Sequence, residues 1–227
     1  MSFKLIGVFG GTFDPIHYGH IKLAQAWKSF ASLSKVLFIP SGLAPHKNIV
    51  LENKHRLEML NLALEPYAEF LTDDREIKKY QNDLQVSYTI ETLKRLTQEK
   101  EESQALCFLM GSDAFLKLES WHLWNELFNY CHILIVERRE SPIHSDQLTP
   151  GLKKEWNKRL TQKIEDIETS AYGLIMVKQF EYIDVSSSQI RNAIHLHKNL
   201  SQLVPEVIAD YINIINFIVK LSNINKF

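Results

Sequence analysis

Two histidines stand one helical turn apart, directly after a glycine-rich stretch, in the segment GVFGGTFDPIHYGHIKLA (7–24). His17 and His20 have the i, i+3 spacing that places two side chains on one face of a helix. Gly10 and Gly11 let backbone N–H groups approach an anion, and a helix start adds unpaired N–H groups and partial positive charge. The pattern predicts a phosphate site in which two imidazoles donate hydrogen bonds to phosphoryl oxygens.

The spacing alone leaves other interpretations open. The same two histidines fit an ordinary surface pair or two ligands of a zinc site, although no third ligand is evident in the sequence. The glycines match neither the G-x-G-x-x-G dinucleotide pattern nor the G-K-[ST] phosphate loop. If the histidines bind phosphate, their chemistry is stabilisation of the charge that builds up on a transferring phosphoryl group.

A second segment with phosphate-binding chemistry is DVSSSQIR (184–191). Ser186 at the N-cap and Gln189 three residues later form a capping-box pattern, which predicts a helix start rich in hydroxyl and N–H groups. Arg191 follows about one turn inside that helix and adds a guanidinium suited to polyphosphate. Taken alone, these residues are more typical of a well-capped surface helix.

Buried strands that alternate with helices must position these segments. Runs of consecutive apolar residues predict strands covered on both faces, as in a parallel sheet, at 4–10, 35–40, 69–72, 105–111, 132–138 and 173–179. Helical apolar spacing occurs at 18–31, 54–64, 88–98 and 203–221. The alternation predicts an α/β fold with a Rossmann-like, doubly wound parallel sheet that binds ligands at the carboxyl ends of its strands.

We expect residues 1–227 to form a single domain, with 140–170 as a partly helical surface insertion and 188–227 as a small C-terminal helical part. A net charge of -1 disfavours nucleic acid as a partner. No apolar run reaches the roughly 18 residues that span a membrane. Cys107 and Cys131 have no metal-binding spacing and are typical of reduced core residues in a cytoplasmic protein.

The segment GGTFDPIHYGH closely resembles the T/H-x-G-H signature of the nucleotidyltransferase superfamily, and VSSSQIR resembles its I-S-S-T-x-I-R motif. In the second motif Val185 replaces Ile and Ser188 replaces Thr. The resemblance implies that His20 stabilises the α-phosphate in the transition state and that His17 aligns the ATP phosphates. It further implies ATP contacts from Gly10, Gly11, Thr12, Phe13, Ser187, Ser188 and Arg191.

Further segments resemble one branch of this superfamily, the bacterial nicotinate-nucleotide adenylyltransferases. IPSGLAPHKN (39–48) is similar to their I-P-x-x-x-P-P-H-K loop, with Ala44 in place of the first Pro of that pair. By this resemblance Lys47 closes over the phosphates as a catalytic residue, together with His17, His20 and Arg191. No metal site on the protein is implied; Mg²⁺ is expected through the ATP phosphates.

The elements S-Y-T, G-x-D and [ST]-W of the same family, which hold the pyridine nucleotide, are matched by SYT (87–89), GSD (111–113) and SW (120–121). The resemblance implies that Trp121, rather than Trp124, stacks on the pyridine. Apart from the resemblance, Ser87 is the expected N-cap of the helix predicted at 88–98. The implied mononucleotide contacts are Asp14, Ser41, Lys47, Thr89, Gly111, Asp113 and Trp121.

The implied reaction joins ATP and nicotinate mononucleotide to give deamido-NAD and pyrophosphate by direct in-line attack. The attacking 5′-phosphate is largely dianionic at pH 7 because its second pKa is near 6, so no general base is required. Alternatives are a superfamily member with a nicotinamide mononucleotide or phosphopantetheine acceptor, or a nucleotide-binding protein without turnover. The preference for the acid over the amide, and the choice between monomer and homodimer, stay open.

Overall fold

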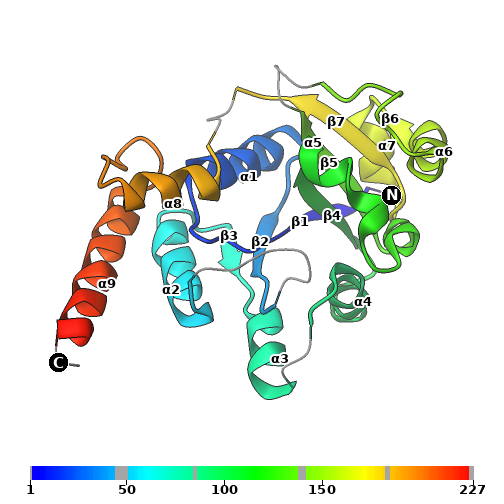
Figure 1. The fold of residues 1–227 in the computed structure, drawn as a ribbon. Coiled ribbons are helices and arrows are strands. Elements are labelled where there is room, and N and C mark those ends of the chain that lie inside the picture. The colour runs from blue at the N-terminus through cyan, green and yellow to red at the C-terminus, as the bar shows by residue number, and fades with distance from the viewer. Residues whose placement is uncertain (1, 44–50, 84–85, 138–141, 182–184, 225–227) are drawn as a thin grey trace.

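The structure is a computed structural model that describes residues 2–43, 51–83, 86–137, 142–181 and 185–224. In this part of the chain seven parallel strands form one sheet in the order β3-β2-β1-β4-β5-β7-β6 (Figure 1). The strand order reverses between β1 and β4, and this reversal opens the crevice in which open α/β sheets bind ligands. The strands are β1 (Lys4–Gly11), β2 (Lys35–Pro40), β3 (Phe70–Thr72), β4 (Gln104–Gly111), β5 (Cys131–Glu137), β6 (Leu160–Thr161) and β7 (Ile175–Gln179).

Helices cover both faces of the sheet (Figure 1). Leu5 and Phe9 of β1 pack with side chains of α1, α2, α8 and α9, whereas Ile6 and Val8 face α4, α5 and α6. This period-2 division between two apolar cores confirms the doubly wound parallel sheet predicted from the consecutive apolar runs. The helices are α1 (Tyr18–Phe30), α2 (Asn53–Leu64), α3 (Arg75–Asp83), α4 (Thr89–Glu99), α5 (Ser112–Phe115), α6 (Pro150–Arg159), α7 (Ile164–Thr169), α8 (Ser187–His195) and α9 (Glu206–Ile224), with 3-10 helices at Leu118–Ser120 and Trp124–Asn129.

The segment 140–170, expected as a partly helical surface insertion, contributes to both the sheet and the core. It contains α6 and α7, and between them the two-residue strand β6 pairs with β7 at the sheet edge. Leu152 and Ile167 are fully buried. The polar composition of the segment conceals these two anchors because most of its other residues face solvent.

The start of α4 differs by one residue from the sequence-based expectation. Tyr88, not Ser87, is the N-cap: it has extended backbone geometry, and its carbonyl accepts hydrogen bonds from the N–H groups of Glu91 and Thr92. The expectation that Ser87 caps this helix was therefore wrong. Ser87 is buried and its hydroxyl makes no hydrogen bond to the described residues, so the packing around the chain, rather than the capping preference of serine, sets where the helix begins.

Both cysteines are buried core residues, as predicted. Cys107 and Cys131 lie on the adjacent strands β4 and β5, are fully buried and form no disulfide. Burial raises the pKa of the Cys131 thiol to about 12, so the side chain behaves as an apolar core group. Nowhere in the described ranges is there a helix long and apolar enough to cross a membrane.

One buried histidine makes the stability of this fold depend on pH. His132 of β5 is fully buried; its Nε2 lies 2.9 Å from the Ser170 carbonyl oxygen, and its Nδ1 accepts a hydrogen bond from the Leu174 N–H at 3.3 Å. Nδ1 as acceptor requires a neutral ring. Burial lowers the pKa of His132 to about 4. The unfolded chain therefore binds a proton at a pH where the folded chain does not.

We expect the free energy of unfolding to fall as the pH drops from about 6.5 towards 4, since protons favour the unfolded state in that window. Between pH 7 and pH 5, His132 accounts for about 2 kcal/mol of that loss. Urea unfolding of His132→Gln should show a loss smaller by this amount, whereas the exposed control His144→Gln should keep the wild-type slope. Equal slopes for wild type and His132→Gln would contradict this account.

Candidate active site

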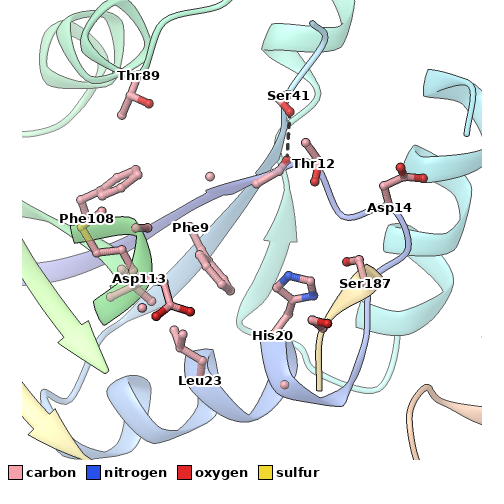
Figure 2. A pocket seen from close by; sticks show the side chains of 18 of the residues that line it. Phe9, Thr12, Asp14, His20, Leu23, Ser41, Thr89, Phe108, Asp113 and Ser187 are labelled. Atoms are coloured by element: carbon pink, nitrogen blue, oxygen red, sulfur yellow. Dashed lines mark hydrogen bonds between the residues drawn. The ribbon is translucent and has the colours of Figure 1, made fainter. Parts of the chain in front are cut away.

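A cavity of about 720 Å³ lies at the carboxyl ends of β1, β2 and β4, where the strand order reverses (Figure 2). Its walls come from the turn between β1 and α1, the start of α4, the end of β4 and the start of α8. Figure 2 shows His20 and Ser187 beside one another on one side, with Thr89 on the other. The volume is within the range typical of small-ligand sites, about 300–1,000 Å³.

The cavity brings together most of the residues predicted from the sequence. Among the described residues, Phe13 is the exception: it is fully buried and does not line the cavity. Lys47 lies outside the described residues. The predicted residues that line the cavity are Gly10, Gly11, Thr12, Asp14, His17, His20, Ser41, Thr89, Gly111, Asp113, Trp121, Ser187, Ser188 and Arg191.

His17 is held in one protonation state and one orientation. It is the N-cap residue of α1, and its Nδ1 accepts a hydrogen bond from the His20 N–H at 3.3 Å. The side chain is nearly buried, and burial lowers the pKa of His17 to about 3. At neutral pH the ring is therefore neutral, with Nδ1 as acceptor and the hydrogen on Nε2. His17 is suited to donate a hydrogen bond and is a very weak base.

The His20 ring is fixed by aromatic contacts. It stacks on His17 with ring centroids 3.6 Å apart and an interplanar angle of 25°. The rings of Phe9 and Phe13 pack against it at centroid distances of 5.8 and 5.0 Å. Phe13 reaches this position from a left-handed backbone conformation, φ 46°. Its observed contribution is thus support of His20 from below, in addition to any backbone contact with ATP.

The described residues offer no further ligands for a zinc site at the histidine pair. Among the residues that the structure describes, no group of three or more His, Cys, Asp or Glu side chains is arranged to hold a metal ion. Zinc sites need at least three protein ligands. The stacked arrangement of His17 and His20 favours the phosphate interpretation.

The two segments predicted to bind phosphate are in direct contact although they are far apart in the sequence. Ser187 Oγ donates to the Pro15 carbonyl oxygen at 3.1 Å, 172 positions away. Arg191 Nη1 donates to the Asp14 carbonyl oxygen at 2.6 Å and lies 3.6 Å from the Asp14 carboxylate. Gly19 permits this approach, because a Cβ there would lie 3.1 Å from Val185 Cγ1 and 3.0 Å from His17 Nδ1.

The start of α8 has the predicted capping box. Gln189 N–H donates to Ser186 Oγ at 3.2 Å, and the Ser186 N–H donates back to Gln189 Oε1 at 2.7 Å. Arg191 Nη2 also donates to Ser188 Oγ at 3.1 Å. The helix start, its hydroxyls and the guanidinium therefore face the cavity as one preorganised group.

Sequence reasoning missed Arg56, whose guanidinium lies under the site. Arg56 of α2 is fully buried and donates to the carbonyl oxygens of Thr12 and Ser41 and to Asn53 Oδ1. Ser41 in turn donates from its N–H and its Oγ to the Gly11 carbonyl oxygen, a contact drawn in Figure 2. The helical spacing of Arg56 from Met59 and Leu60 was the available signal, because it places Arg56 on the buried face of α2.

The far end of the cavity has both predicted and unpredicted residues. Trp121 lines it and packs edge-on against Phe108 at a centroid distance of 6.0 Å. Trp124 packs against Phe128 instead and is not part of the lining. Lining residues at this end that were not among the predicted contacts are Glu76, Ser87, Tyr88, Ser112 and His122. Ser87, Tyr88 and Ser112 lie within the SYT and GSD segments, whereas no motif marks Glu76 or His122.

The parallel sheet has a cavity at its switch point. Two histidines and a helix start rich in serine and arginine line this cavity. The arrangement is that of a nucleotidyltransferase of Rossmann-like fold. The chain belongs to the cytidylyltransferase-like family, whose model matches residues 8–193.

Similar proteins span nearly its whole length. A protein of Vesicomyosocius okutanii subsp. Calyptogena okutanii named "Probable nicotinate-nucleotide adenylyltransferase" is 38% identical over 215 residues, which are 93% of this chain and 95% of the relative. A Dechloromonas aromatica protein of the same name is 33% identical, with 91% and 94% covered. The nicotinic acid mononucleotide adenylyltransferase of Plasmodium falciparum, complexed with NaAD, shares the fold with a TM-score of 0.71 at 18% identity, covering 94% of this chain and 96% of its own.

Replacement of Arg56 tests its structural role. Arg56→Met removes three donated hydrogen bonds, two of them to the carbonyl oxygens of Thr12 and Ser41. We expect the free energy of unfolding to fall by about 3 kcal/mol, the scale for loss of hydrogen bonds from a charged donor. Urea unfolding measures this loss. The control Arg95→Met, on the exposed side of α4, should change stability by less than about 0.5 kcal/mol; equal losses in both variants would contradict the role of Arg56.

Proposed function

We propose that this chain is a nicotinate-nucleotide adenylyltransferase, which joins ATP and nicotinate mononucleotide to give deamido-NAD and pyrophosphate. The observation that carries the proposal is a single cavity lined at one end by His17, His20 and Arg191 and at the other by Thr89 and Trp121. Relatives of that name match this chain over more than nine-tenths of its length, which supports the same assignment.

ATP is proposed to occupy the end of the cavity built from the two motifs. Gly10, Gly11, Thr12 and Phe13 belong to the turn that offers backbone groups, and Ser187, Ser188 and Arg191 hold the β- and γ-phosphates. The Arg191 guanidinium already has one fixed partner in the Asp14 carbonyl. It is therefore oriented before the nucleotide arrives, which lowers the entropic cost of binding.

The mononucleotide is proposed to occupy the opposite end. Trp121 stacks on the pyridine, and Thr89 with neighbouring backbone N–H groups faces the ring substituent. Ser41, Gly111 and Asp113 line the path between the two ends. Asp14 belongs to this group as well, although its carboxylate also accepts the Leu51 N–H at 3.1 Å. Lys47 remains part of the proposal as the cation that closes over the phosphates.

The proposed reaction is a direct displacement. An oxygen of the mononucleotide 5′-phosphate forms a bond to the α-phosphorus of ATP, and the bond to the pyrophosphate oxygen breaks with its electron pair. No proton transfer is needed because the attacking phosphate is largely dianionic at pH 7. His20 and His17 stabilise the charge on the α-phosphate and the leaving group by donating hydrogen bonds. This fits the low pKa of His17, which excludes it as a base near pH 7.

Mg²⁺ is proposed to reach the site with ATP. The cation would be held mainly by phosphate oxygens and water. When bound, the ion neutralises phosphate charge.

We further propose a cytoplasmic location, which the two buried free cysteines favour. The proposed partners are small molecules rather than nucleic acid. Monomer and homodimer are both compatible with the site.

Pyrophosphate release separates the candidate functions. We expect release from ATP and Mg²⁺ when nicotinate mononucleotide is the acceptor, since this cavity has both an ATP end and a pyridine end. Nicotinamide mononucleotide and phosphopantetheine are tested in parallel. Release with phosphopantetheine alone would make the chain another adenylyltransferase of the superfamily, and ATP binding without release from any acceptor would make it a nucleotide-binding protein.

Replacement of His20 tests the mechanism. His20→Ala removes one donor to the transition state, so we expect kcat to fall by about 10²-fold or more with a smaller change in the KM for ATP. Steady-state kinetics with nicotinate mononucleotide measure both constants. The exposed His144→Ala variant is the control. Near-normal turnover of a correctly folded His20→Ala enzyme would exclude the assigned role.

A further inference from the structure

A carboxyl group that the proposed mechanism does not use lies at the pyridine end of the cavity. Glu76, on α3, lines this cavity together with Ser87, Tyr88 and Thr89 from the start of α4. Glu76 and Ser87 also line a second, small cavity behind the first, so they form the wall between the two. Thr89 is the residue proposed to face the substituent of the pyridine ring. In the proposed binding mode, Glu76 therefore lines the same end of the cavity as the group that distinguishes the acid from the amide.

The hydrogen bonds of Glu76 leave one of its oxygens available. Oε1 accepts a hydrogen bond from Thr92 Oγ1 at 2.6 Å. No other hydrogen bond to this carboxyl group is formed by the residues that the structure describes. Thr92 is itself buried and holds the side chain against α4. Oε2 is thus the atom that can exchange a hydrogen bond with a ligand in the cavity.

Charged groups of both signs surround Glu76. Its own helix has three cations, and each is paired: Arg75 with Asp73 and Glu99, Lys78 with Asp74, and Lys79 with Glu91. Arg95 faces it from α4 across the small cavity, and Asp113 and His122 line the large cavity with it. Burial is the largest cause and raises the pKa of Glu76 to about 7; the Asp73 carboxylate adds to the rise, whereas the Thr92 hydrogen bond, Lys79 and Arg75 oppose it.

We propose that Glu76 determines the ring-substituent specificity of the acceptor site: its neutral carboxyl group donates a hydrogen bond to a ring carboxylate, and its ionised form repels that carboxylate and accepts from a ring amide. This inference rests on the proposed function. Specificity then depends on which of two hydrogen bonds the Glu76 side chain makes: one donated to a ring carboxylate, or one accepted from a ring amide. No proton is transferred to the substrate; binding of the acid retains the proton on Glu76.

The protonation state of Glu76 then sets how the preference varies with pH. Nicotinate mononucleotide binds the protonated enzyme, so its kcat/KM falls as the pH rises through 7, by up to about tenfold per pH unit above it. The kcat/KM of nicotinamide mononucleotide does not fall with it. Both acceptors have the same 5′-phosphate, so the titration of that phosphate cancels in the ratio of their kcat/KM values. The ratio isolates the group that faces the ring.

The experiment measures kcat/KM for both acceptors at saturating ATP and Mg²⁺ from pH 6 to pH 8. In the wild-type enzyme we expect the acid-to-amide ratio to fall by about tenfold or more over this range. Glu76→Gln has a permanent donor and no titration, so its ratio should be independent of pH. Glu102→Gln is the control: it removes an exposed carboxylate that lines neither cavity, and should retain the wild-type dependence.

A binding measurement supports the same conclusion without a variant. Calorimetric titrations in two buffers of different ionisation enthalpy count the protons taken up when each acceptor binds. At pH 7.5 binding of nicotinate mononucleotide should be accompanied by uptake of a larger fraction of a proton than binding of nicotinamide mononucleotide.

Three outcomes overturn the inference while leaving the adenylyltransferase intact: a pH-independent ratio in the wild-type enzyme, an unchanged slope in Glu76→Gln, or equal proton uptake for the two acceptors. Absence of pyrophosphate release with both acceptors overturns the proposed function itself.

Discussion

The turn between β1 and α1 is the element on which the rest of the site depends, and three side chains from distant segments hold its carbonyl groups. Arg56 of α2 binds the Thr12 oxygen, Arg191 binds the Asp14 oxygen, and Ser187 binds the Pro15 oxygen. The turn has no regular secondary structure of its own, and a phosphate site needs fixed donors. The protein supplies this rigidity by satisfying buried carbonyls with side chains that the sheet and α8 bring together.

These contacts also bear on how a chain with a net charge of -1 would form the proposed phosphate site. The charge is local: two guanidinium groups bind the turn, one beneath it and one at the cavity. The imidazole nearest the helix start is kept neutral, because burial lowers the pKa of His17 to about 3. A neutral donor stabilises developing negative charge without binding the ground-state phosphate as tightly as a cation does, which is the difference that lowers a barrier.

Much of this arrangement was predictable because it depends on local patterns. Consecutive apolar residues identified the buried strands, and the fold followed from their alternation with helices. The missing parts depend on tertiary contacts. Strand β6 has two residues and no pattern; Tyr88 replaces its neighbour Ser87 as N-cap; and Arg56 becomes important only because Thr12 and Ser41 lie above α2. For Glu76, one acidic residue among many, the sequence offers no sign of its position in the cavity wall.

The two ends of the cavity differ in a way that matches the chemistry proposed for them. Transfer of an adenylyl group to a phosphate dianion moves no proton, so the donors around the phosphates perform best if they do not titrate near neutral pH. His17, whose pKa burial lowers to about 3, meets that requirement. Choice between a ring carboxylate and a ring amide, in contrast, depends on whether the protein donates or accepts at one position. A carboxyl group is the side chain that can do either, and burial places the pKa of Glu76 at about 7. On the proposed roles, the His17 donor at the phosphate end keeps one protonation state near pH 7, whereas Glu76 at the pyridine end changes its own.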